Sequence, residues 1–298
     1  MQNKVLLMDV VDGLKQYEDN SVDCIILDPP YNIGKDFGNN KTRNEIQEYV
    51  AWAKTWLTEA KRVLKDSGTM FVYGFPEILA HISVNLDMDH RWLVWHYTNK
   101  TVPSLHFWQR SHESILCAWK DKTQRVFNRD DVREEYTEGF VKGYKGKNRK
   151  RTATSGRFGK SADTVYEVND KGALPRDVIK VSSLAGGAGS RERFIYSPSN
   201  KTLYTRKHAK ALEISDGISH PTQKPVAITE KLLRSCMVDD MKVLIPFAGT
   251  GSECFVCDQL GIQWEAYDIN DDYVDMANLL VRDGFPKNPA KEKTKENS

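Results

Sequence analysis

Short runs of apolar residues alternate with helical patterns over the first hundred residues of the chain. Four runs have the length and composition of strands, at residues 5–8, 24–27, 69–73 and 92–97. Between the second and the third, apolar side chains from Ile46 to Leu64 recur at three- and four-residue spacing, which predicts an amphipathic helix. We expect that helix to end near Gly68. Strands that alternate with helices indicate an α/β fold.

The pattern changes between residues 101 and 217 and then returns. The middle stretch is rich in Gly, Ser, Lys and Arg, and within it residues 114–120 have the pattern of a strand. Beyond Pro221 we predict helices at 226–237, 253–260 and 271–281, and strands at 242–245 and 264–267. Residues 1–100 and 218–286 are therefore expected to form one α/β domain with a mainly parallel sheet. Residues 101–217 are predicted to be an inserted lobe, because so long a loop without structure is improbable in a compact domain.

Composition narrows the class of protein. No apolar run reaches the roughly 18 residues that a membrane span needs, and the mean hydropathy is −0.57. Asp9 comes too early for the apolar core of a signal peptide, and five cysteines are too few for a disulfide scaffold. We therefore expect a cytoplasmic protein. Residues 287–298 are rich in Lys and Glu and are predicted to be disordered.

The tetrapeptide Asp28-Pro29-Pro30-Tyr31 directly follows the predicted strand at 24–27. An ionised Asp only accepts hydrogen bonds, and the two prolines have no backbone N–H. The motif therefore offers acceptors and an aromatic ring, which suits an exocyclic amino group on a planar base. Asp28 and the Pro29 carbonyl oxygen are expected to accept from that amino group, with Tyr31 stacked on the base. The alternative is a stiff turn capped by Asp28.

A glycine turn, Phe247-Ala248-Gly249-Thr250-Gly251, lies between the strand at 242–245 and the next helix. Glycine at such a turn allows the backbone to approach a ligand closely. A dinucleotide fingerprint needs a third glycine at position 254, where the chain has Cys254. Asp268 ends the following strand, where an acid holds ribose hydroxyls. The pattern favours a cofactor loop other than one for NAD over an ordinary turn.

Residues 21–32, Ser-Val-Asp-Cys-Ile-Ile-Leu-Asp-Pro-Pro-Tyr-Asn, resemble the catalytic motif of the amino-group DNA methyltransferases. These enzymes transfer a methyl group from S-adenosylmethionine to adenine N6 or cytosine N4. The glycine turn is similar to the loop that binds S-adenosylmethionine in the same family. The motif order, with the catalytic motif first and the cofactor loop last, resembles the permuted β-type members. The resemblance covers residues 4–37, 92–120 and 218–282.

The resemblance implies a Rossmann-like, doubly wound fold whose insert recognises the target. Residues 1–100 are then the catalytic half, 101–217 the DNA-binding region and 218–286 the cofactor-binding half. It implies catalytic roles for Asp28, Pro29, Pro30 and Tyr31, on a base flipped out of the duplex. The implied cofactor-binding residues are Asp9, His220, Thr222, Lys224, Phe247, Ala248, Gly249, Thr250, Gly251 and Asp268. Glu113 matches a position that is often acidic in the family.

The chain departs from the family pattern at Ile245. Many members have an acidic residue two positions before the Phe of the cofactor loop, and this chain has isoleucine there. Recognition of the methionine ammonium group is then expected to rest on backbone carbonyl groups or on another acid.

A basic stretch at 142–160 contains eight Lys or Arg and no Asp or Glu. It is expected to neutralise DNA phosphates, through Lys145, Lys147, Arg149, Lys150 and Arg151, unless it is only solvated surface. Trp95 or Tyr97 is either a second stacking face for the base or buried core. Cys254 and Cys257 are interpreted as packing residues, and we expect no metal site.

We expect an adenine-specific enzyme that acts on double-stranded DNA, because Asp as the first residue of the tetrapeptide is commoner among adenine enzymes of the family. Cytosine N4 is the alternative base, and a catalytically silent DNA-binding relative is the alternative class. RNA or protein as the substrate is a weaker alternative. The β-type members often pair, so the resemblance implies a homodimer. A restriction endonuclease that acts on the same site is a further partner to test, and the sequence does not reveal that site. On DNA, the protein is expected to be associated with the nucleoid.

Overall fold

The computed structural model describes residues 1–32, 45–99, 103–144, 147–149, 164–165, 169–185 and 191–287. The chain divides into a large unit, formed by Met1–Phe127 and Asp177–Ser298, and a small unit, Asn128–Arg176. None of the helices in these described ranges combines the length and the apolar character needed to cross a membrane.

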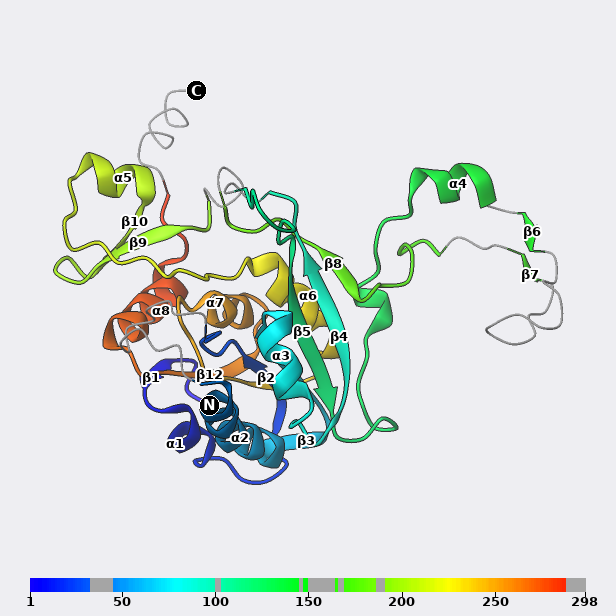
Figure 1. Ribbon diagram of the computed structural model, residues 1–298, viewed down its shortest axis with the longest axis horizontal. Helices are drawn as coiled ribbons and strands as arrows, with labels where there is room; N and C mark the ends of the chain where they lie inside the picture. The colour runs from blue at the N-terminus through cyan, green and yellow to red at the C-terminus, as the bar shows by residue number, and fades with distance from the viewer. Residues whose placement is uncertain are drawn as a thin grey trace. The chain divides into compact units, whose positions relative to one another are not determined.

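The large unit is built on a sheet of eight strands from the described residues (Figure 1). In spatial order they are β1 (Val5–Leu7), β12 (Gln263–Asp268), β11 (Lys242–Ile245), β2 (Val22–Leu27), β3 (Leu64–Gly74), β5 (His112–Trp119), β4 (Asp89–His96) and β8 (Val178–Lys180). Of these eight, β5 runs antiparallel to both of its neighbours, and the other pairings are parallel. The predicted α/β fold with a mainly parallel sheet is confirmed.

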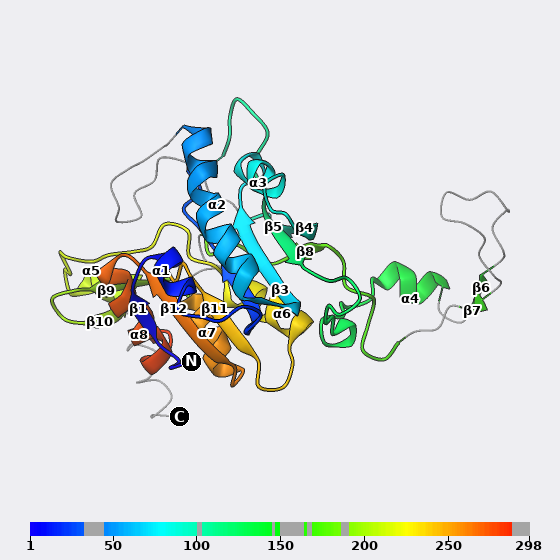
Figure 2. The ribbon, with the colours of Figure 1, turned by 90° about the horizontal axis from the view of Figure 1, so that it is seen from below.

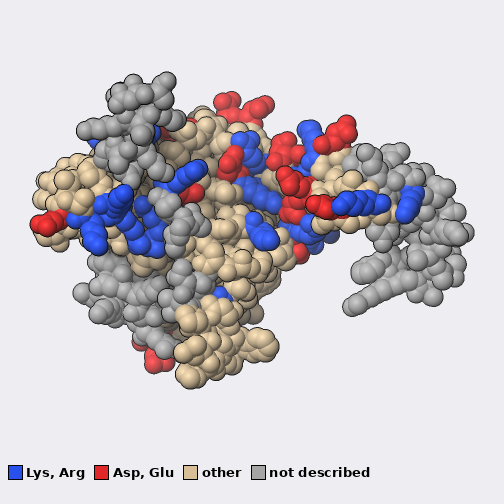
Figure 3. Space-filling view, turned by 90° about the horizontal axis from the view of Figure 1, so that it is seen from above, with Lys and Arg blue, Asp and Glu red and all other residues tan. Residues whose placement is uncertain are grey.

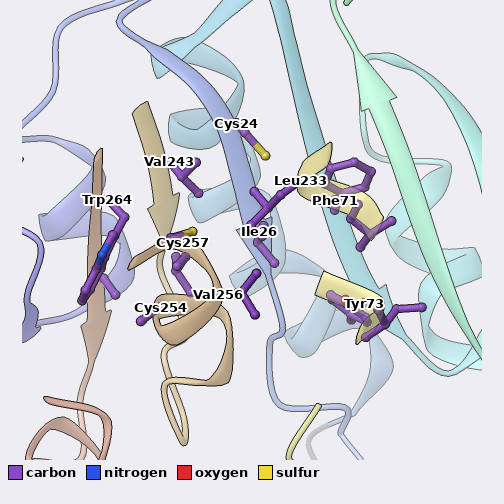
Figure 4. Packing of buried hydrophobic residues seen from close by; sticks show 14 of the residues in the cluster. Cys24, Ile26, Phe71, Tyr73, Leu233, Val243, Cys254, Val256, Cys257 and Trp264 are labelled. Carbon is purple, nitrogen blue, oxygen red and sulfur yellow. The ribbon is translucent and has the colours of Figure 1, made fainter. Parts of the chain in front are cut away.

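Helices cover both faces of the sheet because side chains along each strand alternate in direction. On one face, Ile25 and Leu27 of β2 pack with α1 (Val10–Leu14), α2 (Ile46–Val63) and α3 (Pro76–Ser83). On the other face, Cys24 and Ile26 pack with α6 (Val226–Cys236), α7 (Ser252–Gln259) and α8 (Asp271–Asp283). Figure 4 shows the second face, where side chains of β2, β3 and β11 meet those of α6 and α7. Each large side chain buried in this way contributes about 1.5–3 kcal/mol.

Gly68 does not end the predicted helix. Helix α2 stops at Val63 and β3 begins at Leu64, so Gly68 lies inside the strand. A Cβ atom on Gly68 would lie 2.7 Å from Cδ1 of Leu64 and 2.9 Å from the carbonyl oxygen of Asp23. The glycine therefore allows close packing between β3 and β2, which a sequence pattern of helix breakers does not reveal.

The segment predicted as an insert contributes to both units. Its strands β5 and β8 belong to the main sheet. The hairpin of β9 (Phe194–Ser197) and β10 (Thr202–Thr205), followed by α5 (Arg206–Ala211), packs through Phe194 and Tyr196 on α8. The small unit contains the short 3-10 helix η1 (Arg129–Asp131), α4 (Glu138–Tyr144) and the paired strands β6 (Asn148–Arg149) and β7 (Thr164–Val165). Most of the tail predicted to be disordered, from residue 288 onward, lies outside the described residues.

Candidate active site

Two adjacent strands send the helices that follow them to opposite faces of the sheet. Strands β2 and β11 run parallel, with Cys24 opposite Val243. Helix α2 follows β2 onto one face, and α7 follows β11 onto the other. Ligands of open α/β sheets bind beyond the carboxyl ends of the strands at such a switch. A cavity of about 240 Å³ lies there.

Most of the predicted site residues line this cavity. They are Asp9, Asp28, Pro30, His220, Thr222, Lys224, Phe247, Ala248, Gly249, Thr250 and Asp268. The lining also includes Tyr49 and Trp52 of α2, and Glu253 of α7. Three predicted residues, Pro29, Tyr31 and Gly251, are not among the residues that line it.

The glycine turn after β11 depends on backbone conformations and space that favour glycine. Gly249 and Gly251 have φ angles of +50° and +78°. A Cβ atom on Gly251 would lie 2.6 Å from Cβ of Ala277 on α8, and one on Gly249 would lie 3.1 Å from Nε2 of His220. The turn therefore packs tightly against α8 while the Gly249 side of it faces the cavity.

Two acids at strand ends hold neighbouring backbone groups and also line the cavity. The two carboxylate oxygens of Asp268 accept hydrogen bonds from the N–H groups of Gly249 and Asn270, each at 2.9 Å. Burial raises the pKa of the Asp268 carboxyl group. Asp9 caps α1 by accepting from the N–H of Val11 at 2.8 Å. Each carboxylate has lone pairs left for a ligand, because a carboxylate can accept about four hydrogen bonds.

Asp28 lies in a buried network of charged and polar groups. Nζ of Lys224 donates to Oδ2 of Asp28 at 2.7 Å and to the carbonyl oxygen of Thr222 at 3.1 Å. The side chain of Lys224 is 1% exposed, so Asp28 supplies the countercharge that this buried ammonium group requires. Burial lowers the pKa of Lys224, but the carboxylates of Asp28 and Glu113 outweigh it and the pKa is raised.

Tyr31 belongs to this network and is otherwise enclosed. Its hydroxyl group donates to Oδ1 of Asp28 at 2.8 Å, and its ring contacts Phe75 edge to face, with centroids 5.0 Å apart. Tyr31 is 2% exposed. The ring of Tyr31 is enclosed, and its hydroxyl group is bonded to Asp28. The stacking of Tyr31 on a base therefore stays a prediction.

A family model described as a DNA methylase matches residues 22–279. The chain belongs to the N6/N4 DNA methylase family. It is therefore a DNA amino-methyltransferase, as the sequence motifs predicted.

Relatives of this methylase are named as methyltransferases. It is 28% identical over 290 residues to the type II methyltransferase M.HpaI of Haemophilus parainfluenzae, covering 96% of this chain and 76% of the relative. It is 25% identical over 271 residues to the DNA adenine methyltransferase YhdJ of Escherichia coli K12, covering 90% and 79%.

Solved structures share the fold. The cytosine-N4-specific PvuII DNA methyltransferase matches with a TM-score of 0.60 and 14% identity, over 98% of this chain and 89% of that one. The complex of M1.HpyAVI with S-adenosylmethionine matches with a TM-score of 0.54 and 17% identity, over 92% and 96%.

The methylase has an acid beside Tyr31 to which sequence reasoning gave no mechanism. Oε2 of Glu113, at the start of β5, lies 3.1 Å from the Tyr31 hydroxyl oxygen and 3.9 Å from Nζ of Lys224. Burial raises the pKa of Glu113, while Lys224 acts in the opposite direction. The hydroxyl group has one hydrogen, so it cannot donate fully to both Asp28 and Glu113. Asp28 and Glu113 therefore share this single hydrogen as acceptors.

A second acid, Glu253, was missed in the sequence. It lies in the first turn of α7, lines the cavity and is 5% exposed. Its Oε1 atom is buried without a hydrogen-bond partner among the described residues. Burial, together with the nearby Asp28, raises its pKa to about 7. Ile245, where the family often has an acid, is buried at the end of β11 instead. The missing acid at 245 was the signal to search for another nearby.

The structure also bears on two other interpretations made from the sequence. Trp95 and Tyr97 are 2% and 8% exposed and contact each other within the core, and Nε1 of Trp95 donates to the carbonyl oxygen of Val181 at 2.8 Å. Of the two roles considered for them, the structure favours core. Cys254 and Cys257 are buried among apolar side chains as free cysteines (Figure 4).

Most of the DNA-binding residues predicted in the basic stretch are not among the residues that the structure describes. Lys145, Lys150 and Arg151 lie outside the described residues. Lys147 is exposed, and the backbone of Arg149 belongs to β6. Elsewhere, Figure 3 shows Lys and Arg side chains gathered at the end of the large unit that carries α5, where Arg206, Lys207 and Lys210 are exposed.

Proposed function

We propose that this methylase transfers a methyl group from S-adenosylmethionine to N6 of an adenine flipped out of duplex DNA. The observation that carries the proposal is the position of Asp28. Its carboxylate and Pro30 line the same cavity as the glycine turn and Asp268, so one space accommodates both an amine acceptor and a cofactor. S-adenosylmethionine supplies an electrophilic methyl group on a positively charged sulfur.

The cofactor half of the cavity fits a nucleoside with an amino-acid tail. Gly249 has no side chain to occupy the space next to His220. Asp268 and Asp9 each keep lone pairs after bonding the backbone, and we assign Asp268 to the ribose hydroxyls and Asp9 to the adenine ring of the cofactor. Trp52 and Phe247, whose rings are 5.9 Å apart, supply apolar walls.

Glu253 takes the role that Ile245 leaves open. A buried carboxylate oxygen without a donor carries a large desolvation penalty. The α-ammonium group of the methionine moiety has three N–H donors and a positive charge, whereas the sulfonium has no donor. We therefore assign Glu253 to the ammonium group. Lys224 does not neutralise Glu253 by direct contact, because it is bonded to Asp28 and the Thr222 carbonyl.

Asp28 acts on the target amine, and the groups around it hold it in position. The amine lone pair is delocalised into the base, so acceptors on its hydrogens direct it toward the methyl group. Each Asp28 oxygen already accepts one hydrogen bond, from Tyr31 or from Lys224, and keeps a lone pair for the amine. Lys224 and Tyr31 thus fix the orientation of the carboxylate, and Lys224 is a positioning residue as well as part of the cavity wall.

Adenine is the base favoured by the first residue of the tetrapeptide, Asp28, and by a relative whose name states adenine. Cytosine N4 is the second candidate, named by a structural neighbour that shares the fold. The test is transfer of labelled methyl groups to mixed-sequence duplex DNA, followed by digestion and separation of nucleosides. N6-methyladenine supports the proposal. N4-methylcytosine alone would overturn the choice of base, and DNA binding without any transfer would identify a silent relative.

A further inference from the structure

The loop at residues 103–110, between β4 and β5, exposes an unusual set of apolar side chains. Leu105, Phe107 and Trp108 are 80%, 82% and 87% exposed. Single exposed apolar residues are common on protein surfaces, but a cluster of large ones marks a surface with a partner. Three within four residues form such a cluster.

Described contacts hold this loop in a defined conformation. The N–H of Ser104 donates to Oε1 of Gln109 at 2.7 Å, which closes the loop on itself. The guanidinium group of Arg110 donates to Oε1 of Glu77 at 2.6 Å and lies 4.3 Å from the centre of the Phe75 ring. The apolar side chains therefore project from an anchored base, and Figure 2 shows the loop extending beyond α3.

The loop stands at the same edge of the sheet as Asp28. Strand β4 runs in the same direction as β2, so its carboxyl end lies at the edge where the cavity opens. Two ring contacts join the loop to the site, since Arg110 lies on Phe75 and Phe75 contacts Tyr31. Glu113, just after the loop, lies beside the Tyr31 hydroxyl group.

Duplex DNA is the partner that fits this position. The family acts on DNA, and a base reaches Asp28 only by leaving the stack, which leaves a gap in the duplex next to the cavity. Proteins that distort DNA insert apolar side chains between bases, and aromatic rings stack on any base. Arg110 is the one permanently ionised residue between positions 103 and 110, and it is paired with Glu77. The loop therefore offers apolar contact rather than neutralisation of phosphates.

We propose that Leu105, Phe107 and Trp108 form an apolar wedge that enters the duplex beside the flipped base and stacks on the bases left behind. The proposal rests on the proposed function in requiring a flipped base, but it does not depend on which base is methylated. A wedge of this kind releases no counterions, so its contribution to affinity does not change with salt.

The test is the double variant Phe107→Ala/Trp108→Ala in the full-length protein, with Val84→Ala as the matched control. Val84 is also exposed, at 81%. It follows the last residue of α3, and the catalytic edge of the sheet lies toward the first residue of that helix, so Val84 is on the side away from the site. Affinity for duplex DNA is measured across a salt series, together with affinity for S-adenosylmethionine and the oligomeric state. We expect DNA affinity to fall about tenfold or more in the double variant, at an unchanged salt slope. Cofactor affinity is expected to stay unchanged, and Val84→Ala to behave as wild type.

Unchanged DNA affinity in the double variant would overturn the wedge. So would a change of oligomeric state that accounts for the loss, because the loop would then be a contact between copies of the chain. Failure of the proposed function is a separate result, because it is measured by methyl transfer and the wedge is measured by DNA affinity. A wild-type protein that binds DNA but transfers no methyl group would still allow the wedge to be tested.

Discussion

At the scale of single residues, the site is organised by the buried lysine and the acids around it. Lys224 bonds Asp28 directly and is 3.9 Å from Glu113, while Glu253 is left without a donor for one oxygen. A buried charge without compensation is costly, so each of these groups depends on the others or on a ligand. The roles of individual residues can therefore be separated by conservative substitutions.

Asp28→Asn is expected to reduce methyl transfer to below a few percent of wild type. The substitution keeps the shape but exchanges one acceptor oxygen for an NH₂ donor and removes the charge opposite Lys224. Cofactor binding, measured by calorimetry, should remain largely intact, because Asp268 and the glycine turn are unchanged. Turnover well above a few percent would show that Asp28 is not the group that acts on the amine.

We predict that cofactor binding depends on pH because of the raised pKa of Glu253. Burial and Asp28 raise its pKa from 4.5 to about 7, so the carboxyl group is protonated below that pH before a ligand binds. Its contribution to the stability of the protein is present below pH 4.5 and is lost as the pH rises through about 7. An ammonium ligand favours the ionised form, so affinity for S-adenosylmethionine should rise by up to about tenfold per pH unit below pH 7 and then level off.

Titration calorimetry between pH 5.5 and pH 8 measures this dependence, and Glu253→Gln is the control. The glutamine variant should bind more weakly at pH 8 and should lose most of the slope below pH 7. A slope that survives in Glu253→Gln would assign the proton to another group.

At the scale of elements, the turn between β11 and α7 is fixed by steric fit as well as by backbone conformation. Gly251 and Gly261 both have positive φ, at +78° and +68°. A Cβ atom on Gly251 meets Ala277 at 2.6 Å, whereas one on Gly261 has nothing within 4 Å. The pair therefore separates backbone strain from overlap with α8.

Gly251→Ala is expected to destabilise the protein more than Gly261→Ala. Both variants carry the cost of a left-handed non-glycine residue, about 1–2 kcal/mol, and Gly251→Ala adds the displacement of α8. Thermal unfolding measures the difference, and cofactor affinity should fall in Gly251→Ala alone. Equal losses in the two variants would mean that α8 gives way without cost.

At the scale of the whole molecule, DNA affinity is predicted to have a strong electrostatic component. Replacing Lys145, Lys147, Arg149, Lys150 and Arg151 with Ala should weaken binding to all sequences and flatten the plot of log affinity against log salt. The double variant of the loop at 103–110 is also expected to lower DNA affinity, but at an unchanged salt slope, so the slope distinguishes the two contributions. A slope that is unchanged in the five-residue variant would show that the basic stretch is not on the DNA.

Oligomeric state is also a property of the whole molecule. We expect a homodimer, as the resemblance to β-type members implied. Light scattering at micromolar protein concentration measures the mass in solution, and a monomeric mass would remove this expectation.

The sequence by itself determined the fold class and the neighbourhood of the site. Strand and helix periods identified most elements of the sheet, and Asp28 and Gly249 were recognised because parallel strands bring their carboxyl ends to one edge. Such local signals are readable because a motif and the strand before it are adjacent in the chain.

Only the tertiary structure decided how the acids are paired and which aromatic residues are exposed. Lys224 meets Asp28 across 196 positions of sequence, and Glu113 reaches Tyr31 across 82. Tyr31 and Trp95 are enclosed while Trp108 is exposed, although all three are aromatic residues close to strand ends. The partner of a side chain and its access to solvent depend on elements that pack together from distant parts of the chain, and no local pattern records them.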